Sequence, residues 1–295
     1  MASAATVRSE SAGSNPPLVR GDPLVPRMLL GQRLRDLREA TGMSRAEAGR
    51  TIRASRSKIS RIERGRTGLR HADVAELLSA YGIRDEAERS TLLTLTDQAN
   101  ARPWWYGHRD VVPPWMRRYL SAEQAARLVR CFGDRYVPEL LRTDAYAREV
   151  IGEQAPDRRV ELLARRRRIL RRRPRPVNLW VVLDEAALWR PVGDAVTMRG
   201  QLEHLREISW RPNVTVQIAP FNIGGRVAAG GPLTLVRFPQ QTLPDLVYLE
   251  RDGEGVYPAR PGEIEHHWHI FNTLVTEAAA PEHTPRIIER ALAEY

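Results

Sequence analysis

Apolar residues recur at helical spacing along the first third of the chain. The pattern predicts helices over about 27–40, 71–81 and 85–100, with two short helices between the first and second of these. Ser44 and Ser55 are good N-caps for the short helices, and Glu47 completes a capping box with Ser44. Residues 25–100 are therefore expected to form an all-α domain of five helices.

The helix that begins at Ser55 separates its apolar and polar positions onto two sides. Ile59 and Ile62, together with Ile52 before the helix, fall at spacings that place them on the buried side. The opposite side carries basic and hydroxyl side chains, namely Arg56, Ser57, Lys58, Ser60 and Arg61. A helix of this kind is suited to reading base edges in the major groove of double-stranded DNA. An ordinary helical hairpin with a solvated basic face is the alternative.

Residues 29–79 also resemble the helix-turn-helix of the Xre and phage-repressor class. The resemblance is carried by residues 34–38, by Gly42-Met43-Ser44-Arg45, and by the run from Ser55 to Gly65. It implies that Arg56, Ser57 and Arg61 face base edges, with Lys58 close by, and that Arg45 lies against the phosphate backbone. The residues predicted to contact DNA are Arg45, Ser55, Arg56, Ser57, Lys58, Ser60 and Arg61.

The chain departs from this class at two places. Arg45 stands where glutamine is usual, and we expect it to increase the non-specific electrostatic attraction to DNA. Ala48-Gly49 replaces a larger apolar residue and alanine, which predicts a thinner core and a helix-weakening glycine.

A cluster of large aromatic residues and prolines follows the helical region. Trp104, Trp105, Tyr106 and Trp115 lie among prolines within residues 101–120. These rings could stack on exposed bases. Their position between two domains favours a packed aromatic hinge, because large aromatic side chains are usually buried.

The pattern after the hinge mixes helices and strands. Helices are predicted at 121–131, 143–152, 157–172, 197–210 and 262–279. Strands are predicted at 179–183, 214–218, 233–238 and 246–249. The predicted fold is thus an all-α N-terminal helix-turn-helix domain followed by a larger α+β domain over 121–280, with a disordered tail at 1–24 and a C-terminal tail at 281–295.

Most of the remaining chain, from Trp104 to about Glu277, is similar to the sensor-like domain of WhiJ-like actinobacterial regulators. The motifs that carry this resemblance are Trp104-Trp105, residues 136–143, 183–188, 190–193, 201–205 and 212–217, and Pro220-Phe221. The resemblance implies a transcriptional regulator that is often paired with a small BldB-like protein, and it implies no particular ligand or cofactor.

Charge is concentrated in two segments of a chain whose net charge is +10. Residues 45–70 hold nine basic and two acidic side chains, and residues 158–176 hold ten arginines and one glutamate. Local basic segments point to contact with polyanions. In the second segment Arg167, Arg168, Arg171 and Arg172 could contact phosphates or an acidic partner, and a solvated surface helix is the simpler interpretation.

The other candidate sites are weaker. His266 and His269 could share a metal on neighbouring helical turns, but no third ligand is fixed by spacing, so we predict no metal site. Asp184, Glu185 and Glu250 could form a paired-carboxylate site, but helix capping is the simpler role for the first two. We therefore expect no enzyme activity.

The bulk properties favour a soluble cytoplasmic protein. No apolar run reaches the roughly 20 residues that span a bilayer, and the N-terminus lacks the apolar segment of a secretory signal. The single cysteine, Cys131, is expected to be a small buried apolar residue.

Two functions remain open at this point. The first is a DNA-binding transcriptional regulator, acting as a homodimer, whose C-terminal domain senses a ligand or a partner. The second is an antitoxin-like interaction protein that binds a small acidic partner and autoregulates its operon. An apolar pocket lined by the four predicted strands would favour the first.

Overall fold

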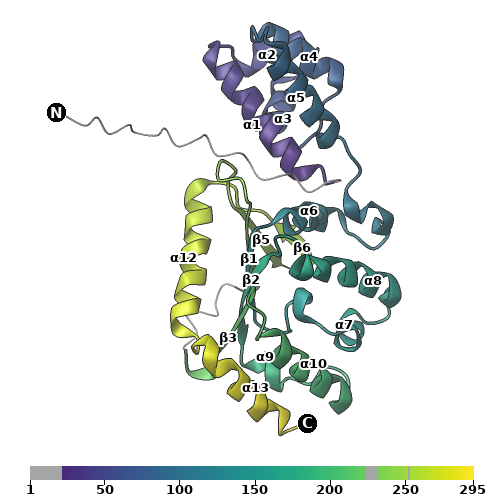
Figure 1. Cartoon of the computed structure of the whole chain (residues 1–295), viewed down its shortest axis with the longest axis vertical. Helices are drawn as coiled ribbons and strands as arrows, with labels where there is room; N and C mark the ends of the chain where they lie inside the picture. The colour runs from purple at the N-terminus through teal and green to yellow at the C-terminus, as the bar shows by residue number, and fades with distance from the viewer. Residues whose placement is uncertain (1–21, 224–230, 252) are drawn as a thin grey trace, which may run out of the picture.

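The structure is a computed structural model that describes residues 22–223, 231–251 and 253–295 (Figure 1). A helical N-terminal domain is followed by a larger domain built on a six-stranded sheet, as the sequence predicts. The predicted tail lies almost entirely outside the described residues. Its last residues, Asp22, Pro23 and Leu24, are buried, and Leu24 already begins the first helix.

Five helices form the N-terminal domain: α1 (Leu24–Ala40), α2 (Arg45–Thr51), α3 (Arg56–Glu63), α4 (His71–Ala80) and α5 (Glu86–Ala99). Their apolar sides meet in one core that includes Leu34 of α1, Ile59 of α3 and Leu77 of α4. The predicted caps are confirmed, because Ser44 and Glu47 form a reciprocal capping box and Ser55 Oγ accepts a hydrogen bond from Lys58 N at 3.1 Å.

Gly49 of α2 lies against the connection between α2 and α3. A Cβ atom added at Gly49 would lie 2.5 Å from the carbonyl oxygen of Ala54 in the connection between α2 and α3. The glycine predicted to weaken α2 therefore permits the close approach of the connection that leads into α3.

The hinge packs against the larger domain through its tryptophans. It contains two short 3-10 helices, η1 (Trp104–His108) and η2 (Pro114–Met116), followed by α6 (Arg117–Ala125). Trp104 Nε1 donates to Leu120 O at 3.2 Å, and Trp105 Nε1 donates to Ser121 Oγ at 3.0 Å. Both rings are half-buried against the core of the larger domain, which agrees with a packed hinge.

The sheet of the larger domain has the strand order β3-β2-β1-β4-β5-β6. The strands are β1 (Leu128–Gly133), β2 (Asn178–Asp184), β3 (Val214–Ala219), β4 (Leu233–Arg237), β5 (Leu246–Arg251) and β6 (Glu254–Val256). The first three run parallel to one another, and β4, β5 and β6 each pair antiparallel with the preceding strand in that order.

Helices cover both faces of the sheet (Figure 1). One face packs against α12 (Pro261–Glu277) through residues such as Phe271 and Leu274. The other face packs against α6, α7 (Asp144–Ile151), α8 (Pro156–Arg167), α9 (Ala186–Trp189), α10 (Ala195–Ile208) and α13 (Thr284–Leu292). Short 3-10 turns complete the chain at Glu139–Leu141, Arg168–Arg171, Phe221–Ile223 and Pro281–His283.

Three predictions of secondary structure were wrong. The helix predicted at 121–131 is replaced by the end of α6 and by β1, because the apolar run from Leu128 to Gly133 is a strand buried between two neighbours. The edge strand β6 was not predicted. The C-terminal tail predicted at 281–295 contains α13, which buries Ile288 and Ala291 in the main core and whose Thr284 Oγ1 donates to Val216 O of β3 at 2.6 Å.

Candidate nucleic-acid interface

The helix α3 has a buried apolar side and an exposed basic and hydroxyl-bearing side. Ile59 and Ile62 are 1% and 2% exposed and belong to the core of the N-terminal domain. Arg56, Ser57 and Arg61 are exposed, and Lys58 and Ser60 are half-buried. The predicted division of α3 into a buried and a presented side is therefore confirmed.

Side chains from α2 and α3 converge on a shallow hollow of about 400 Å³. Its lining residues are Arg45, Arg56, Ser57, Ser60, Arg61 and Arg64. Four of the six are arginines, and none is acidic. We call this surface the reading face; it offers guanidinium and hydroxyl donors, which are the groups that pair with guanine, with other base edges and with phosphates.

Two of the predicted residues have a different role from the rest. Ser55 caps α3 through its hydroxyl oxygen and fixes the start of the helix. Lys58 Nζ lies 4.0 Å from Asp73 Oδ2 on α4, so its charge is partly compensated within the domain. Arg64, at the C-cap of α3, lines the reading face although the sequence patterns did not single it out.

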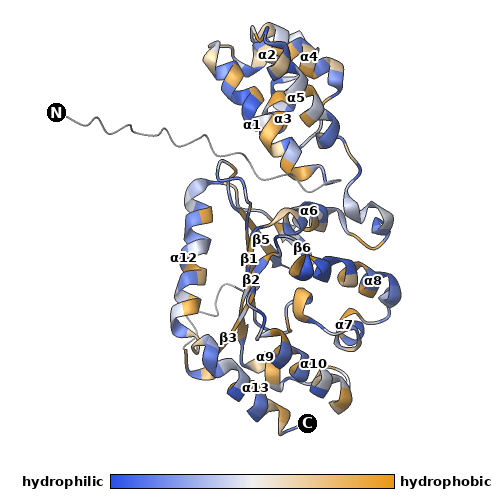
Figure 2. Ribbon diagram, in the orientation of Figure 1, coloured by the Kyte–Doolittle hydropathy of each residue, from blue (hydrophilic) through white to orange (hydrophobic). Residues whose placement is uncertain are grey.

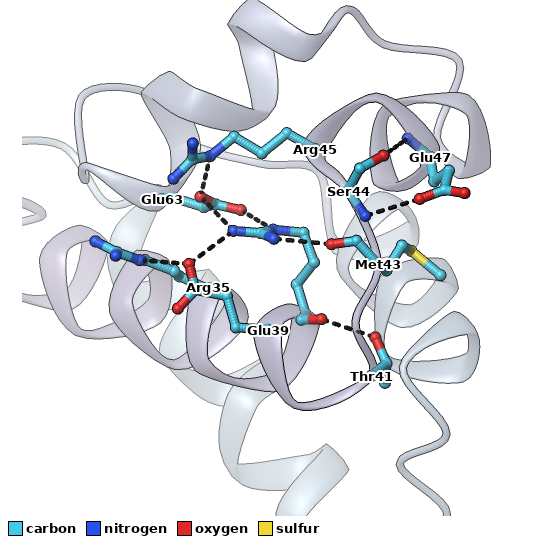
Figure 3. A network of polar contacts seen from close by, with 9 residues as sticks. Arg35, Glu39, Thr41, Met43, Ser44, Arg45, Glu47 and Glu63 are labelled. Atoms are coloured by element: carbon cyan, nitrogen blue, oxygen red, sulfur yellow. Dashed lines mark hydrogen bonds and ion pairs between the residues drawn. The ribbon is translucent and has the colours of Figure 1, made fainter.

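A buried carboxylate ties α3 to the two preceding helices (Figure 3). The side chain of Glu63 is 5% exposed and accepts hydrogen bonds from Arg38 Nε at 2.6 Å and from Arg45 Nε at 2.7 Å. Arg38 also donates to Met43 O at 2.8 Å, in the turn before α2. Arg45 is thus held at the edge of the reading face by an ion pair.

The carboxylate of Glu63 shifts the pKa values of two neighbouring side chains, Arg38 and Tyr81. The hydrogen bond to Glu63 raises the pKa of the Arg38 guanidinium above its ordinary value. Burial, assisted by the negative charge of Glu63, raises the pKa of Tyr81 to about 12. Tyr81 therefore stays protonated throughout the neutral range.

The arginines proposed for phosphate or partner contacts divide into two pairs. Arg167 donates to Arg142 O at 2.6 Å and pairs with Asp144, and Arg172 donates to the carbonyl oxygens of Gln124, Ala126 and Arg175. These two side chains therefore hold the fold together. Arg168 and Arg171 are exposed and line a hollow of about 290 Å³ with His204 and Arg211.

Arg166, in the same segment, is a buried structural residue that the sequence reasoning missed. Its guanidinium forms two hydrogen bonds of 2.8 Å with Glu123, pairs with Glu139, and lies 5.5 Å from the ring centre of Tyr119. Figure 2 shows hydrophilic residues over most of α8, and hydropathy alone cannot distinguish Arg166 from its exposed neighbours.

The remaining candidates have local structural contacts. Asp184 Oδ1 accepts from Ala186 N, at the start of α9, at 2.8 Å, as the capping interpretation predicts. For Glu185 that interpretation is wrong, because its buried carboxylate makes no capping hydrogen bond and instead accepts from Phe221 N at 3.2 Å. Glu250 accepts from the hydroxyl of Tyr248 at 3.1 Å.

On α12, His266 and His269 are exposed; within the described residues no group of three or more potential ligands is arranged to hold a metal. In the same residues no helix is long and apolar enough to cross a membrane.

Comparison with known proteins identifies both parts of the chain. A family model described as a helix-turn-helix domain matches residues 29–92, and such a domain indicates a DNA-binding regulator. A second model, described as a domain of unknown function (DUF5753), matches residues 116–290. No curated protein and no solved structure gives a significant match. Because the second match covers more than half of the chain, the protein belongs to the DUF5753 family and carries a helix-turn-helix domain ahead of the family domain.

Proposed function

We propose that the protein is a sequence-specific transcriptional regulator of the Xre class, related to the WhiJ-like regulators, whose C-terminal domain senses a ligand or a partner. The observation that carries this proposal is the reading face, where four arginines and two serines converge over α2 and α3. The residues that line it include no acidic side chain, which favours contact with a polyanion.

Within the reading face, we assign base contacts to Arg56, Ser57 and Arg61. They lie on the exposed side of α3, within its first two turns. We assign phosphate contacts to Arg45, the first residue of α2, and to Arg64, at the C-cap of α3. We propose in addition that the protein acts on DNA in the cytoplasm, as a homodimer, and without a catalytic activity of its own.

The test uses a duplex that the full-length protein selects from a random library. Losing one bidentate arginine contact is expected to cost Arg56→Ala and Arg61→Ala each about 1–3 kcal/mol of discrimination between the selected and a scrambled duplex. Arg84→Ala, at an exposed arginine between α4 and α5, is the matched control and should bind like the wild type. Unchanged discrimination in both α3 variants would refute the assignment.

The antitoxin-like alternative keeps one supporting observation. Arg168 and Arg171 are exposed beside Arg211, and this basic surface of the larger domain fits a small acidic partner, such as a BldB-like protein. Purification of the complex from native cells, with Arg168→Gln/Arg171→Gln as the comparison, decides between the two functions. A stoichiometric acidic partner that is lost in this variant would favour the alternative.

A further inference from the structure

A cavity of about 740 Å³ lies between the two domains. The N-terminal domain contributes the first turn of α1 and the turn at Gly65-Arg66. The hinge, the start of α6 and Tyr257 close the other side. Figure 1 shows the beginning of α1 next to α6 at this junction. A volume of this size is typical of sites for small molecules, and such sites are common between domains.

The cavity is lined by five arginines: Arg27, Arg66, Arg109, Arg117 and Arg118. Its lining includes no acidic residue. Among the described residues, none of the five forms an ion pair within 4.0 Å, whereas Arg158, Arg166 and Arg167 of α8 all do. The buried Asp22 offsets part of the charge of Arg27. The other four arginines have no ion-pair partner in the part of the chain that the structure describes, so the cavity concentrates positive charge.

Aromatic rings stand directly beside these guanidinium groups. Arg109 lies 4.7 Å from the ring centre of Tyr106, Arg117 lies 5.7 Å from that of Trp105, and Arg118 lies 5.3 Å from that of Tyr257. All three rings line the cavity. The site thus offers flat apolar surfaces and donors for anions within the same space.

The energetics favour occupation by an anion. Burial, together with repulsion from Arg66, lowers the pKa of Arg118 below its ordinary value. A bound anion would remove that repulsion and accept hydrogen bonds from several guanidinium groups at once. A DNA duplex is too wide to enter a space of this volume, whereas a small molecule fits.

We propose that this cavity binds a small effector with a planar ring system and a phosphate, sulfonate or carboxylate group. Because its walls come from both domains, occupancy favours one arrangement of the DNA-binding domain over others and so changes the affinity for DNA. This coupling rests on the proposed function, whereas the binding itself does not.

The experiment uses the full-length protein and the fluorescent anion 8-anilinonaphthalene-1-sulfonate as the probe. The wild type should bind one probe molecule per chain. Arg117→Gln/Arg118→Gln should weaken this binding about tenfold or more, because two charge-assisted contacts are lost. The single variant Arg117→Gln, at an exposed position, should show an intermediate loss, and thermal unfolding verifies that both variants fold.

The matched control is Arg84→Gln/Arg190→Gln, which removes two exposed arginines outside the cavity and should retain wild-type affinity. Equal probe affinity in the cavity variant and this control would overturn the proposal. So would unchanged probe binding combined with a weaker, less salt-dependent affinity for every duplex, since the arginines would then contact DNA phosphates.

The coupling has a separate readout. Saturating probe should change the affinity of the wild type for its selected duplex by about fivefold or more, and it should have no such effect on the double cavity variant. An unchanged duplex affinity in the wild type would overturn the coupling. Failure of the proposed function has a different signature, which is the absence of any sequence preference in the duplex selection.

Discussion

Glu63 stands where three helices of the DNA-binding domain meet. It ends α3 and accepts hydrogen bonds from Arg38 of α1 and Arg45 of α2, so one carboxylate fixes the orientation of α3. The same contact compensates part of the charge of Arg45. The increase in non-specific attraction expected from Arg45 is therefore smaller than that from an unpaired arginine, and Arg64 becomes the more exposed charge at this edge.

The ion pairs of Arg166 predict a large effect of a single substitution. In Arg166→Met, the carboxylate of Glu123, which is 1% exposed, would lose its ion pair and retain the hydrogen bond from the Tyr119 hydroxyl. An uncompensated buried charge is expected to lower the free energy of unfolding by about 3–5 kcal/mol, measured by urea denaturation. Arg166→Lys should rescue this only in part, because lysine cannot reproduce the two-pronged contact.

The control for this substitution is Arg168→Gln, two positions further along the same arginine-rich segment. Arg168→Gln removes an exposed arginine and should change the free energy of unfolding by no more than about 0.5 kcal/mol. Equal effects at the two positions would mean that the buried ion pairs contribute nothing specific.

Cys131 gives a prediction about reactivity. Burial in β1 raises the pKa of its thiol to about 12, so almost no thiolate is present at pH 8. We expect no reaction of the native protein with a thiol reagent such as 5,5′-dithiobis(2-nitrobenzoate), and stoichiometric reaction in urea. Rapid labelling of the native protein at the same pH would show that β1 opens readily.

At the scale of elements, Gly49 reverses the usual rule for helices. Alanine is normally the better residue within a helix, but the Cβ atom of Gly49→Ala would lie 2.5 Å from Ala54 O. The displaced turn between α2 and α3 should lower the free energy of unfolding by about 1–3 kcal/mol. Because α3 begins just after this turn, the affinity for the selected duplex should fall as well.

A second helical glycine provides the matched control. Gly200 lies within α10 and is exposed, and a Cβ atom added there would meet no other atom within 4 Å. Gly200→Ala should therefore raise the free energy of unfolding by about 0.5–1 kcal/mol. If both alanine variants are more stable than the wild type, the steric argument at Gly49 fails.

Elements with local signals could be predicted from the sequence. The helices α2 and α3 are indicated by Ser44, Glu47 and Ser55, whose contacts lie within three residues along the chain. The strand β1 could not be recognised in this way, because it is held by β2 and β4, far away in sequence. The same reason hides α13, whose apolar side is explained only by the core that it covers.

The residues of the candidate site also divide into those with a local sequence signal and those placed by contacts distant in sequence. Arg56 and Arg61 could be assigned from their spacing relative to Ile59 and Ile62. The pairing of Arg45 with Glu63 joins residues 18 positions apart, and the arginine-lined cavity joins α1 to the hinge, so neither leaves a periodic pattern. Long-range electrostatic contacts of this kind require the fold.

At the scale of the whole molecule, α1 belongs to both domains. Leu24, Val25 and Met28 pack into the main core of the larger domain, whereas Leu30 and Leu34 pack into the core of the DNA-binding domain. A single helix thus connects the two cores without an intervening loop. Any change at the junction that tilts α1 also moves α3, which α1 contacts directly.

The length of α3 leads to a prediction about how many protein chains bind one DNA site. One helix of eight residues covers only a few base pairs, which gives too little contact for high specificity. We therefore expect two chains to bind two half-sites separated by one helical turn, roughly 34–36 Å, or a multiple of it. The selected duplex should then contain an inverted repeat.

Sedimentation of the protein with the selected duplex measures the number of chains bound, and footprinting measures the separation of the protected half-sites. A complex of two chains and one duplex, with two protected segments in register, is the expected result. Arg61→Ala should weaken both half-sites equally, because the two reading faces are identical by symmetry. A single chain that protects one segment at saturation would contradict the dimer, and the specificity would then have to come from contacts outside α3.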